Sequence, residues 1–300
     1  MNSVPVTGSS PEDGEASERS TPTATAQKAE MEAHLPSSEV LLFYPERTVR
    51  GALELRTQDV ERLLPGVCLN DTLIEFGCKY IVQEVADEEL CRSTHVYSPH
   101  FYTSLVGGLG ASACTTPELS KAALRHARVS RWTRLVDVFE NDYVVVPINV
   151  KSHWLLVIIC FAGHALPHEQ ACHGSSGSYI LLFDSLRGHV GNLEEIASHM
   201  RDYLTEEWKT KRESELTFTK LNMPLYVPLT PQQTNNTDCG VYVLLNLETF
   251  FRAAPKLGEP VQMNRRLFTI EDAVLKRAAI REIIMELHEK QRSGSDSSKC

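Results

Sequence analysis

Three short apolar runs lie close together in the middle of the chain, and they constrain the fold more than any other feature. Residues 143–149, 153–161 and 179–185 read YVVVPIN, HWLLVIICF and YILLFDS. Nearly uninterrupted runs rich in β-branched residues are typical of strands that are covered on both faces. Helical periodicity flanks these runs at 72–85, 191–211, 239–251 and 270–287. The sequence therefore predicts an α+β fold, with a small central sheet packed between helices.

The two ends of the chain differ in composition from its middle. Residues 1–36 are acidic and rich in Ser, Thr and Pro, with almost no large apolar side chains, which predicts a disordered tail. Residues 291–300, QRSGSDSSKC, predict a second disordered tail. Between these tails we expect one domain, 37–290, with a polar surface insertion at 162–178.

The charge balance and the hydropathy pattern argue against two classes of partner. The chain has 30 Lys and Arg against 39 Asp and Glu, a net charge of −9. A broad nucleic-acid-binding face requires clustered basic residues, so we expect no nucleic-acid partner. Polar residues interrupt the most apolar stretch, 143–161, so we expect no membrane span. The first twenty residues contain no apolar signal segment, and the eight cysteines are scattered, so we expect an intracellular protein with free thiols.

One cysteine has a setting that suits chemistry. Cys239 follows the polar segment PQQTNNTD and opens the apolar helical pattern 239–251. A thiol in the first turn of a helix lies near unpaired backbone amides and the positive end of the helix dipole, both of which favour the thiolate. Gly240 beside it allows backbone and substrate to approach closely. An inert cysteine at a helix start is the simpler alternative.

A thiolate nucleophile needs a base, and the base needs an orienting group. His153 stands at the head of one predicted strand, and Asp184 stands at the end of the next. A carboxylate after an apolar strand is costly to bury unless it has a partner. If the two strands pair, His153 and Asp184 could meet beside Cys239. Taken singly, the histidine and the aspartate also fit structural and turn-forming roles.

Acyl transfer also requires hydrogen-bond donors at the developing oxyanion. Gln233 lies six residues before Cys239 and could supply one, with the backbone N–H of Cys239 as the other. Gln232 and Asn235 are competitors, and spacing alone does not choose among the three.

A rival constellation has metal-capable side chains. His164, His168, Cys172 and His173 fall in one short polar tract. The tract is loop-like and lacks a second pair of ligands, which favours a flexible surface insertion over a metal centre. We therefore expect no metal.

The motifs together resemble a known family, the ubiquitin-like-protein-specific cysteine proteases, or SUMO proteases. The segments that carry the resemblance are CLNDTLIEFGCKYI (68–81), RWTRLVDVFENDYVVVPIN (131–149), SHWLLVIICF (152–161), ILLFDSL (180–186) and PQQTNNTDCGVYVL (231–244). The opening LLFYP segment and the insertion at 162–178 resemble the chain-editing branch of that family. The resemblance implies a papain-like cysteine protease architecture and no cofactor.

The resemblance also implies roles for individual residues. It implies His153 as general base, Asp184 as its orienter, Cys239 as nucleophile and Gln233 as oxyanion donor. Trp154 would roof a tunnel for the Gly-Gly tail of the modifier, since a side chain larger than glycine would clash there. The implied reaction is removal of SUMO from lysine side chains, with a preference for poly-SUMO chains. The implied setting is a nuclear monomer whose partners are SUMO and SUMO-conjugated proteins.

One position departs from the family pattern. The family usually has an aromatic residue just before Leu-Asn-Asp, where it forms the facing wall of the tunnel, and this chain has Cys68. A looser tunnel keeps two alternatives open: a protease for another ubiquitin-like modifier, and a module that binds SUMO without cleaving it. The complete set of His153, Asp184 and Cys239 argues against the second.

Overall fold

The computed structural model describes residues 39–49, 51–107, 120–167, 177–259 and 268–297. The predicted tail 1–36 lies outside these ranges. The centre of the described part is a five-stranded sheet in the order β3-β4-β5-β6-β7. Its strands are β3 (Thr94–Val96), β4 (Tyr143–Val150), β5 (His153–Cys160), β6 (Tyr179–Phe183) and β7 (Leu225–Tyr226).

Strand pairing in the sheet is mixed. The three central strands β4, β5 and β6 run antiparallel to one another, with Leu156 of β5 opposite Phe183 of β6. The two short edge strands, β3 and β7, each pair in parallel with the strand beside them. The three apolar runs of the sequence are the three central strands, which confirms that part of the prediction. The two edge strands were not predicted because they are only three and two residues long.

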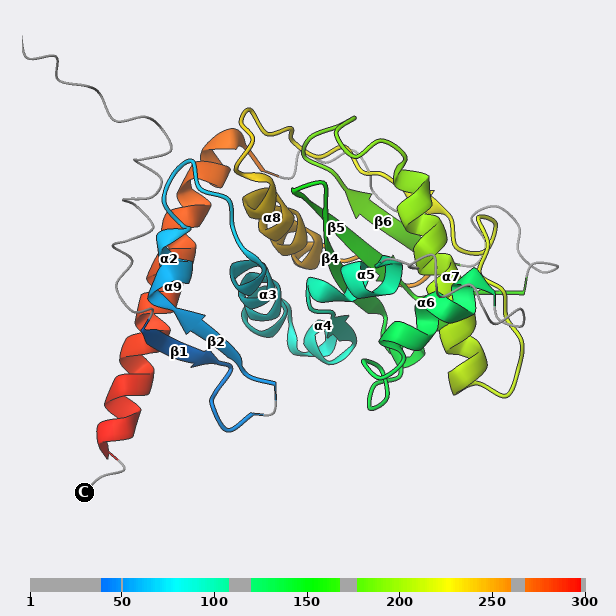
Figure 1. Cartoon of the computed structure of the whole chain (residues 1–300), viewed down its shortest axis with the longest axis horizontal. Coiled ribbons are helices and arrows are strands. Elements are labelled where there is room, and N and C mark those ends of the chain that lie inside the picture. Colours follow the sequence, from blue (N-terminus) through cyan, green and yellow to red (C-terminus); the bar gives the residue numbers. More distant parts are fainter. Residues whose placement is uncertain (1–38, 50, 108–119, 168–176, 260–267, 298–300) are drawn as a thin grey trace, which may run out of the picture. The chain divides into compact units, whose positions relative to one another are not determined.

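The sheet is covered on both faces, as the uninterrupted apolar runs predicted. Alternate residues of β5 enter two separate hydrophobic cores, with Trp154 and Leu156 in one, Leu155 and Val157 in the other. Helices α3 (Asp71–Tyr80) and α8 (Cys239–Arg252) contribute residues to the first core. The π-helical turn η1 (Ile81–Val85) continues α3 and also contributes to this core. The second core is closed by α5 (His100–Val106), α6 (Lys121–Val129) and α7 (Leu193–Lys211) (Figure 1). This layering confirms the predicted α+β class.

The remaining elements lie outside the sheet. They are a two-stranded antiparallel sheet and five helical segments: β1 (Val40–Tyr44), β2 (Leu53–Arg56), α2 (Thr57–Glu61), α4 (Glu88–Arg92), η2 (Val138–Glu140), η3 (Ala162–His164) and α9 (Ile270–Ser297). Residues 168–176 of the predicted insertion 162–178 are outside the described residues. None of the helices in the described ranges combines the length and apolarity needed to cross a bilayer.

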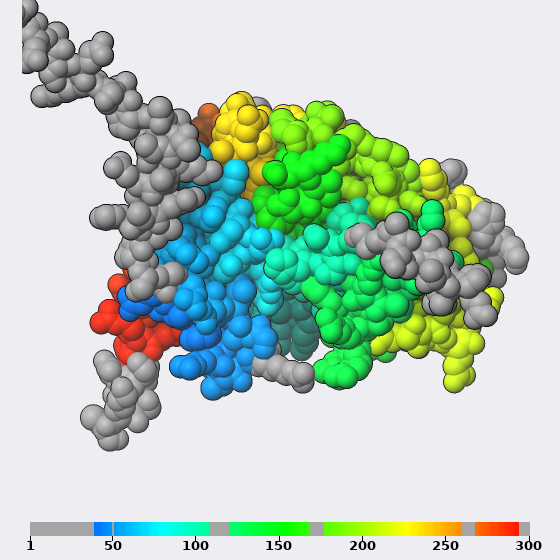
Figure 2. All heavy atoms as spheres, viewed as in Figure 1, coloured from blue at the N-terminus to red at the C-terminus, as the bar shows by residue number. Residues whose placement is uncertain are grey.

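Part of the predicted disordered tail 291–300 is helical: residues 291–297 belong to α9, and residues 298–300 lie outside the described residues. Helix α9 continues through Ser297, and it packs against β1, as the adjoining red and blue segments of Figures 1 and 2 show. The Gln291 side chain accepts a hydrogen bond from the Phe43 amide at 3.2 Å and donates one to the Phe43 carbonyl at 2.6 Å. The polar composition that suggested disorder therefore belongs to a helix that is anchored on an early strand.

Candidate active site

His153 is placed by the turn between two strands. Lys151 and Ser152 connect β4 to β5 with φ values of 52° and 60°, as a tight hairpin turn with two left-handed residues requires. This turn makes His153 the first residue of β5. Because β5 and β6 are antiparallel, the start of β5 and the end of β6 lie at the same edge of the sheet.

His153 and Asp184 meet at that edge. Nε2 of the histidine lies 2.8 Å from Oδ1 of the aspartate, and each residue is only 2% exposed. The same Oδ1 accepts a hydrogen bond from the Leu186 amide at 2.9 Å. Burial raises the pKa of Asp184, but the bonds from His153 and Leu186 outweigh it and hold the pKa below its usual range. Asp184 is therefore an ionised carboxylate, able to hold His153 in one orientation.

Cys239 completes the group as the first residue of α8. It is 2% exposed, and its side chain is hydrogen-bonded to His153. Nε2 of His153 is engaged by Asp184, which leaves Nδ1 for the sulfur. Burial lowers the pKa of His153, but the hydrogen bonds with Asp184 and Cys239 outweigh burial and raise the pKa to about 9. A protonated imidazole at neutral pH favours the thiolate of its sulfur partner.

Gln233 is buried beside the end of β6 with its amide orientation fixed. Its Oε1 accepts a hydrogen bond from the Ser185 hydroxyl at 2.8 Å. Its Nε2 donates to the Asn235 carbonyl at 2.6 Å, and a carbonyl can only accept. The backbone N–H of Gln233 also donates to the Ser185 carbonyl at 2.9 Å. An amide nitrogen carries two hydrogens, so Gln233 can still donate one to a bound oxygen.

Gln232 is committed to other bonds. Both of its N–H groups are used, one by the Asp184 carbonyl at 2.9 Å and one by the Thr230 carbonyl at 3.2 Å. Its Oε1 accepts from the Arg187 amide at 2.9 Å. Gln232 therefore holds the turn after β6 and has no donor left for a substrate.

Asn235 holds the loop that precedes the nucleophile. Its Oδ1 accepts from the backbone amides of Thr237 and Asp238, and its Nδ2 donates to Oδ2 of Asp238 at 2.6 Å. The residue is exposed, whereas Gln233 is 7% exposed. Of the three amides that the sequence left as candidates, Gln233 combines a buried position with an N–H that is not used by another residue.

Trp154 contacts Leu69, and Cys68 directly precedes Leu69 in the chain. The indole Nε1 of Trp154 donates to the Leu69 carbonyl at 3.1 Å, and the ring is 3% exposed. Cys68 is exposed, and its Sγ lies 3.9 Å from the carbonyl oxygen of Asn236. The segment before α3 therefore contacts both Trp154 and the loop that leads to Cys239.

Gly240 has a different neighbour from the one expected. The sequence suggested close approach to a substrate, whereas Gly240 is buried against the start of α3. A Cβ at this position would lie 2.9 Å from Cδ1 of Ile74 and 3.0 Å from Cβ of Leu69. The absence of a side chain lets α8 pack against the protein's own chain, which gives Gly240 a packing role. The expected approach of a substrate to Gly240 stays a prediction.

Sequence reasoning missed two groups around the site. Ser185 fixes Gln233, and its only sequence signal is a small polar residue immediately after Asp184. Arg277 of α9 forms a buried ion pair with Asp238, at 2.6 Å between Nη2 and Oδ1. No local signal marks Arg277, because one arginine in a helix with several charged residues resembles any solvated position.

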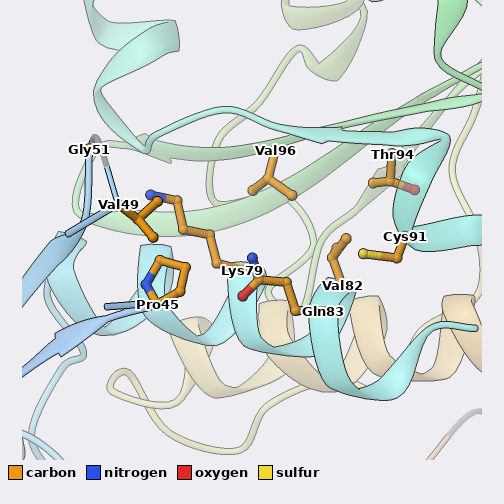
Figure 3. A pocket seen from close by; sticks show the side chains of 9 residues that line it. All are labelled: Pro45, Val49, Gly51, Lys79, Val82, Gln83, Cys91, Thr94 and Val96. Atoms are coloured by element: carbon orange, nitrogen blue, oxygen red, sulfur yellow. The ribbon is translucent and has the colours of Figure 1, made fainter. Parts of the chain in front are cut away.

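Two other features bear on ligand binding: the metal-capable tract and a separate pocket. His168, Cys172 and His173 of the rival metal constellation lie outside the described residues, and His164 ends η3. A separate pocket, shown in Figure 3, is lined by residues of the β1–β2 connection, of α3 with η1, and of α4 with β3. The lining residues are Pro45, Val49, Gly51, Lys79, Val82, Gln83, Cys91, Thr94 and Val96. None of the candidate catalytic residues lines it.

Comparison with known proteins gives the family of the chain. A family model described as "Ulp1 protease family, C-terminal catalytic domain" matches residues 68–276. The chain belongs to the Ulp1 protease family. Sentrin-specific protease 7 of Homo sapiens is 31% identical over 313 residues, which cover 88% of this chain and 30% of the relative. Probable ubiquitin-like-specific protease 2A of Arabidopsis thaliana is 34% identical over 257 residues, which cover 82% of this chain and 32% of the relative. The chain thus spans about a third of the length of these family members.

Solved structures of the family share the fold. A crystal structure of a de-sumoylating protease matches with a TM-score of 0.63 at 22% identity, over 88% of this chain and 96% of that one. The C-terminal Ulp1 protease domain in complex with Smt3, the yeast orthologue of SUMO, matches with a TM-score of 0.56 at 22% identity, over 89% and 96%. The architecture is the papain-like cysteine protease fold that the resemblance implied.

Proposed function

We propose that this protein is a cysteine isopeptidase that removes SUMO from the lysine side chains of conjugated proteins. The observation that carries the proposal is the hydrogen-bonded group of Asp184, His153 and Cys239, with the sulfur at the first residue of a buried helix. Acyl transfer through a covalent intermediate requires a nucleophile that is hydrogen-bonded to a base, and a carboxylate that orients the base.

The first half of the reaction makes a thioester. The Cys239 thiolate forms a bond to the carbonyl carbon of the modifier's terminal glycine, and the carbonyl π electrons move onto oxygen. The free N–H of Gln233 and the backbone N–H of Cys239 stabilise that oxyanion. When the oxyanion collapses, the bond to the lysine nitrogen breaks. Protonated His153 gives its proton to the departing amine.

The second half returns the enzyme to its starting state. Water attacks the thioester carbon while neutral His153 accepts a proton from it. The carbon–sulfur bond then breaks, and Cys239 leaves as the thiolate. The modifier departs with a free carboxylate, and His153 is protonated again. Asp184 holds the imidazole through both halves and remains ionised.

The substrate class rests on the relatives and on the surroundings of the sulfur. Named relatives are sentrin-specific and ubiquitin-like-specific proteases, and one solved neighbour is bound to Smt3. Trp154 is buried and held by Leu69, next to Cys68, which supports a narrow passage for a glycine tail. Only glycine fits between close walls, because any larger side chain would clash.

The proposal includes three finer points. We propose a preference for poly-SUMO chains, which rests on the resemblance of the LLFYP segment and of the insertion at 162–178 to the chain-editing branch. Nuclear location and a monomeric state are proposed on the family resemblance. A preference for chains would appear as faster cleavage of a SUMO dimer linked through lysine than of SUMO fused to a short peptide.

A cleavage assay tests the proposal. SUMO joined to a lysine side chain is incubated with the wild-type protein and with Cys239→Ala, His153→Ala and the control Cys91→Ala. Cys91 is a partly buried cysteine that lines the separate pocket of Figure 3. We expect cleavage by the wild type and by Cys91→Ala alone. Retained cleavage by Cys239→Ala would overturn the mechanism. The same assay is run with a conjugate of another ubiquitin-like modifier, the one that cullins carry. Cleavage of that conjugate in place of the SUMO conjugate would overturn the proposed substrate.

A further inference from the structure

Arg277 lies inside the protein with every donor of its guanidinium used. The residue is 6% exposed, although arginine is usually a surface residue. Nε and Nη2 donate to Oδ1 of Asp238 at 3.1 and 2.6 Å, and Nη2 also donates to the Thr237 carbonyl at 3.1 Å. Nη1 donates to the carbonyls of Arg62 and Leu64 at 3.1 and 3.3 Å. Arg277 thus joins two segments that are far apart in the chain.

Both of these segments lead directly to the site. The segment through Leu64 continues to Cys68 and Leu69, whose carbonyl accepts the Trp154 indole N–H. The other segment, through Asp238, is followed at once by Cys239. One side chain from the C-terminal helix therefore fixes the distance between the proposed tunnel and the nucleophile.

A hydrogen-bond chain continues from Arg277 to the oxyanion donor. Oδ1 of Asp238 is bonded to Arg277, and its Oδ2 accepts from Nδ2 of Asn235 at 2.6 Å. The carbonyl of Asn235 in turn accepts from Nε2 of Gln233 at 2.6 Å. Losing the arginine would free the carboxylate that begins this chain. Arg277 therefore helps to hold the direction of the Gln233 amide from its Nε2 side, while Ser185 holds Oε1.

Charge gives Arg277 a second effect. Asp238 is adjacent in sequence to Cys239, and a carboxylate near a sulfur disfavours the thiolate by like-charge repulsion. Arg277 balances that carboxylate in a buried pair. Tyr242, one turn into α8, lies within electrostatic range of Asp238. On the other side of Cys239 lies His153, which is paired with Asp184.

We infer that Arg277 is a positioning residue for catalysis, which locks the nucleophile loop to the tunnel segment and orients the Gln233 amide through Asp238 and Asn235. The inference rests on the proposed function, because it assigns the part that α9 plays at the same site. Arg277 does not touch the reacting atoms. The family match ends at residue 276, one position before it.

A neighbouring ion pair supplies a matched control. Lys276 Nζ lies 2.8 Å from Oε2 of Glu248, with side chains 13% and 15% exposed. This pair also ties α9 to α8, but at a residue in the last turn and a half of α8, far along the helix from Cys239. Lys276→Gln removes one positive charge and one contact between α8 and α9 without touching the nucleophile loop.

The test compares three single variants, Arg277→Gln, Arg277→Lys and Lys276→Gln. A fourth protein is the double variant that combines Asp238→Asn with Arg277→Gln. Two rates are measured from pH 4 to 10: cleavage of a SUMO–lysine conjugate, and alkylation of Cys239 by iodoacetamide, followed by mass spectrometry. We expect Arg277→Gln to lower kcat by about 10- to 100-fold, less than the roughly 10²- to 10³-fold cost of removing an oxyanion donor, because the Gln233 amide is misplaced and not lost. We also expect Arg277→Gln to move the acid limb of the alkylation rate to higher pH, because the negative charge of Asp238 then has no positive partner at position 277.

The other variants separate charge from geometry. Arg277→Lys keeps the charge, so its acid limb stays in place, while kcat falls because an ammonium cannot join the same four acceptors. Asn at 238 in the double variant restores the acid limb and leaves kcat low. Lys276→Gln keeps both at the wild-type value. Thermal unfolding of each variant shows which proteins are folded, and Arg277→Lys tests the geometry if Arg277→Gln does not fold.

Two results would overturn the inference. One is a folded Arg277→Gln or Arg277→Lys with wild-type kcat, and the other is an effect no larger than that of Lys276→Gln. The pH profile of alkylation does not require SUMO cleavage, so failure of this inference can be told apart from failure of the proposed function. A protein that cleaves no SUMO would still show whether Arg277 sets the reactivity of Cys239.

Discussion

At the scale of single residues, the site depends on one hydrogen-bonded charge pair. Asp184 is buried yet ionised, because His153 and the Leu186 amide both donate to it. The same bond, with that of Cys239, raises the pKa of His153 to about 9 against the opposing effect of burial. At neutral pH the histidine is therefore protonated, as its proposed role of proton donor to the leaving amine requires.

Replacing Asp184 by Asn tests this electrostatic role. The variant removes the negative partner of His153, so its pKa falls and the alkaline limb of kcat/KM moves from near 9 to lower pH. We expect kcat/KM at neutral pH to fall about 10²- to 10⁴-fold, the range of a lost acid–base function. Steady-state cleavage across pH measures both effects.

Asp202→Asn is the matched control for that variant. Asp202 lies on α7, where it pairs with Arg125 at the surface, so the variant changes net charge equally without touching the site. We expect its pH profile to follow the wild type. An unchanged alkaline limb in Asp184→Asn would contradict the assignment of Asp184.

At the scale of elements, the start of α8 is set by how closely it packs on α3. Gly240 faces Ile74 and Leu69 without a side chain, and Gly77 of α3 likewise faces Leu244 of α8 at 2.6 Å from a would-be Cβ. Two glycines, one on each helix, thus bring the helix axes together. This contact places Cys239 beside the strand ends that carry His153 and Asp184.

Gly240→Ala should disturb this contact. The added Cβ would lie 2.9 Å from Ile74 Cδ1, so one helix must shift, and overpacking of this kind destabilises by about 1–3 kcal/mol. Combining it with Ile74→Val removes the Cδ1 atom and should recover part of the loss. Urea unfolding measures the free energy of unfolding of each variant. A Gly240→Ala protein as stable as the wild type would disprove the packing role.

The C-terminal part of α9 offers a second test at this scale. Gln291→Ala removes the bonds to the Phe43 amide and carbonyl, and we expect a loss of about 1–2 kcal/mol in the free energy of unfolding. Lys290→Ala is the control, because Lys290 is exposed on the same turn. Equal urea midpoints for the two variants would contradict the anchoring of β1 by α9.

Sequence patterns predicted elements whose burial is continuous, and they missed contacts between distant residues. The apolar run from His153 to Cys160 could be identified as a two-faced strand because every residue in it is buried. The strand β3 escaped notice because its three residues are only half-buried and pair with a strand about fifty residues later. Arg277 and Gln291 act through partners more than thirty residues away, which no local pattern shows.

At the scale of the whole molecule, the parts of the site come from four regions of the chain. The segment around Cys68, the β4–β5 hairpin, the end of β6 and the loop before α8 converge at one edge of the sheet. The helix α9 then ties the last of these regions to the first through Arg277. The site therefore exists only when the described domain is folded as a unit.

Covalent trapping tests the central claim most directly. SUMO carrying a C-terminal thiol-reactive electrophile is incubated with the wild type, with Cys239→Ala and with His153→Ala, and the cross-linked residue is located by mass spectrometry. We predict one SUMO adduct, on Cys239, that disappears in Cys239→Ala and forms far more slowly in His153→Ala. An adduct on Cys68, or no adduct despite measurable SUMO binding, would contradict the assignment of Cys239 as the nucleophile.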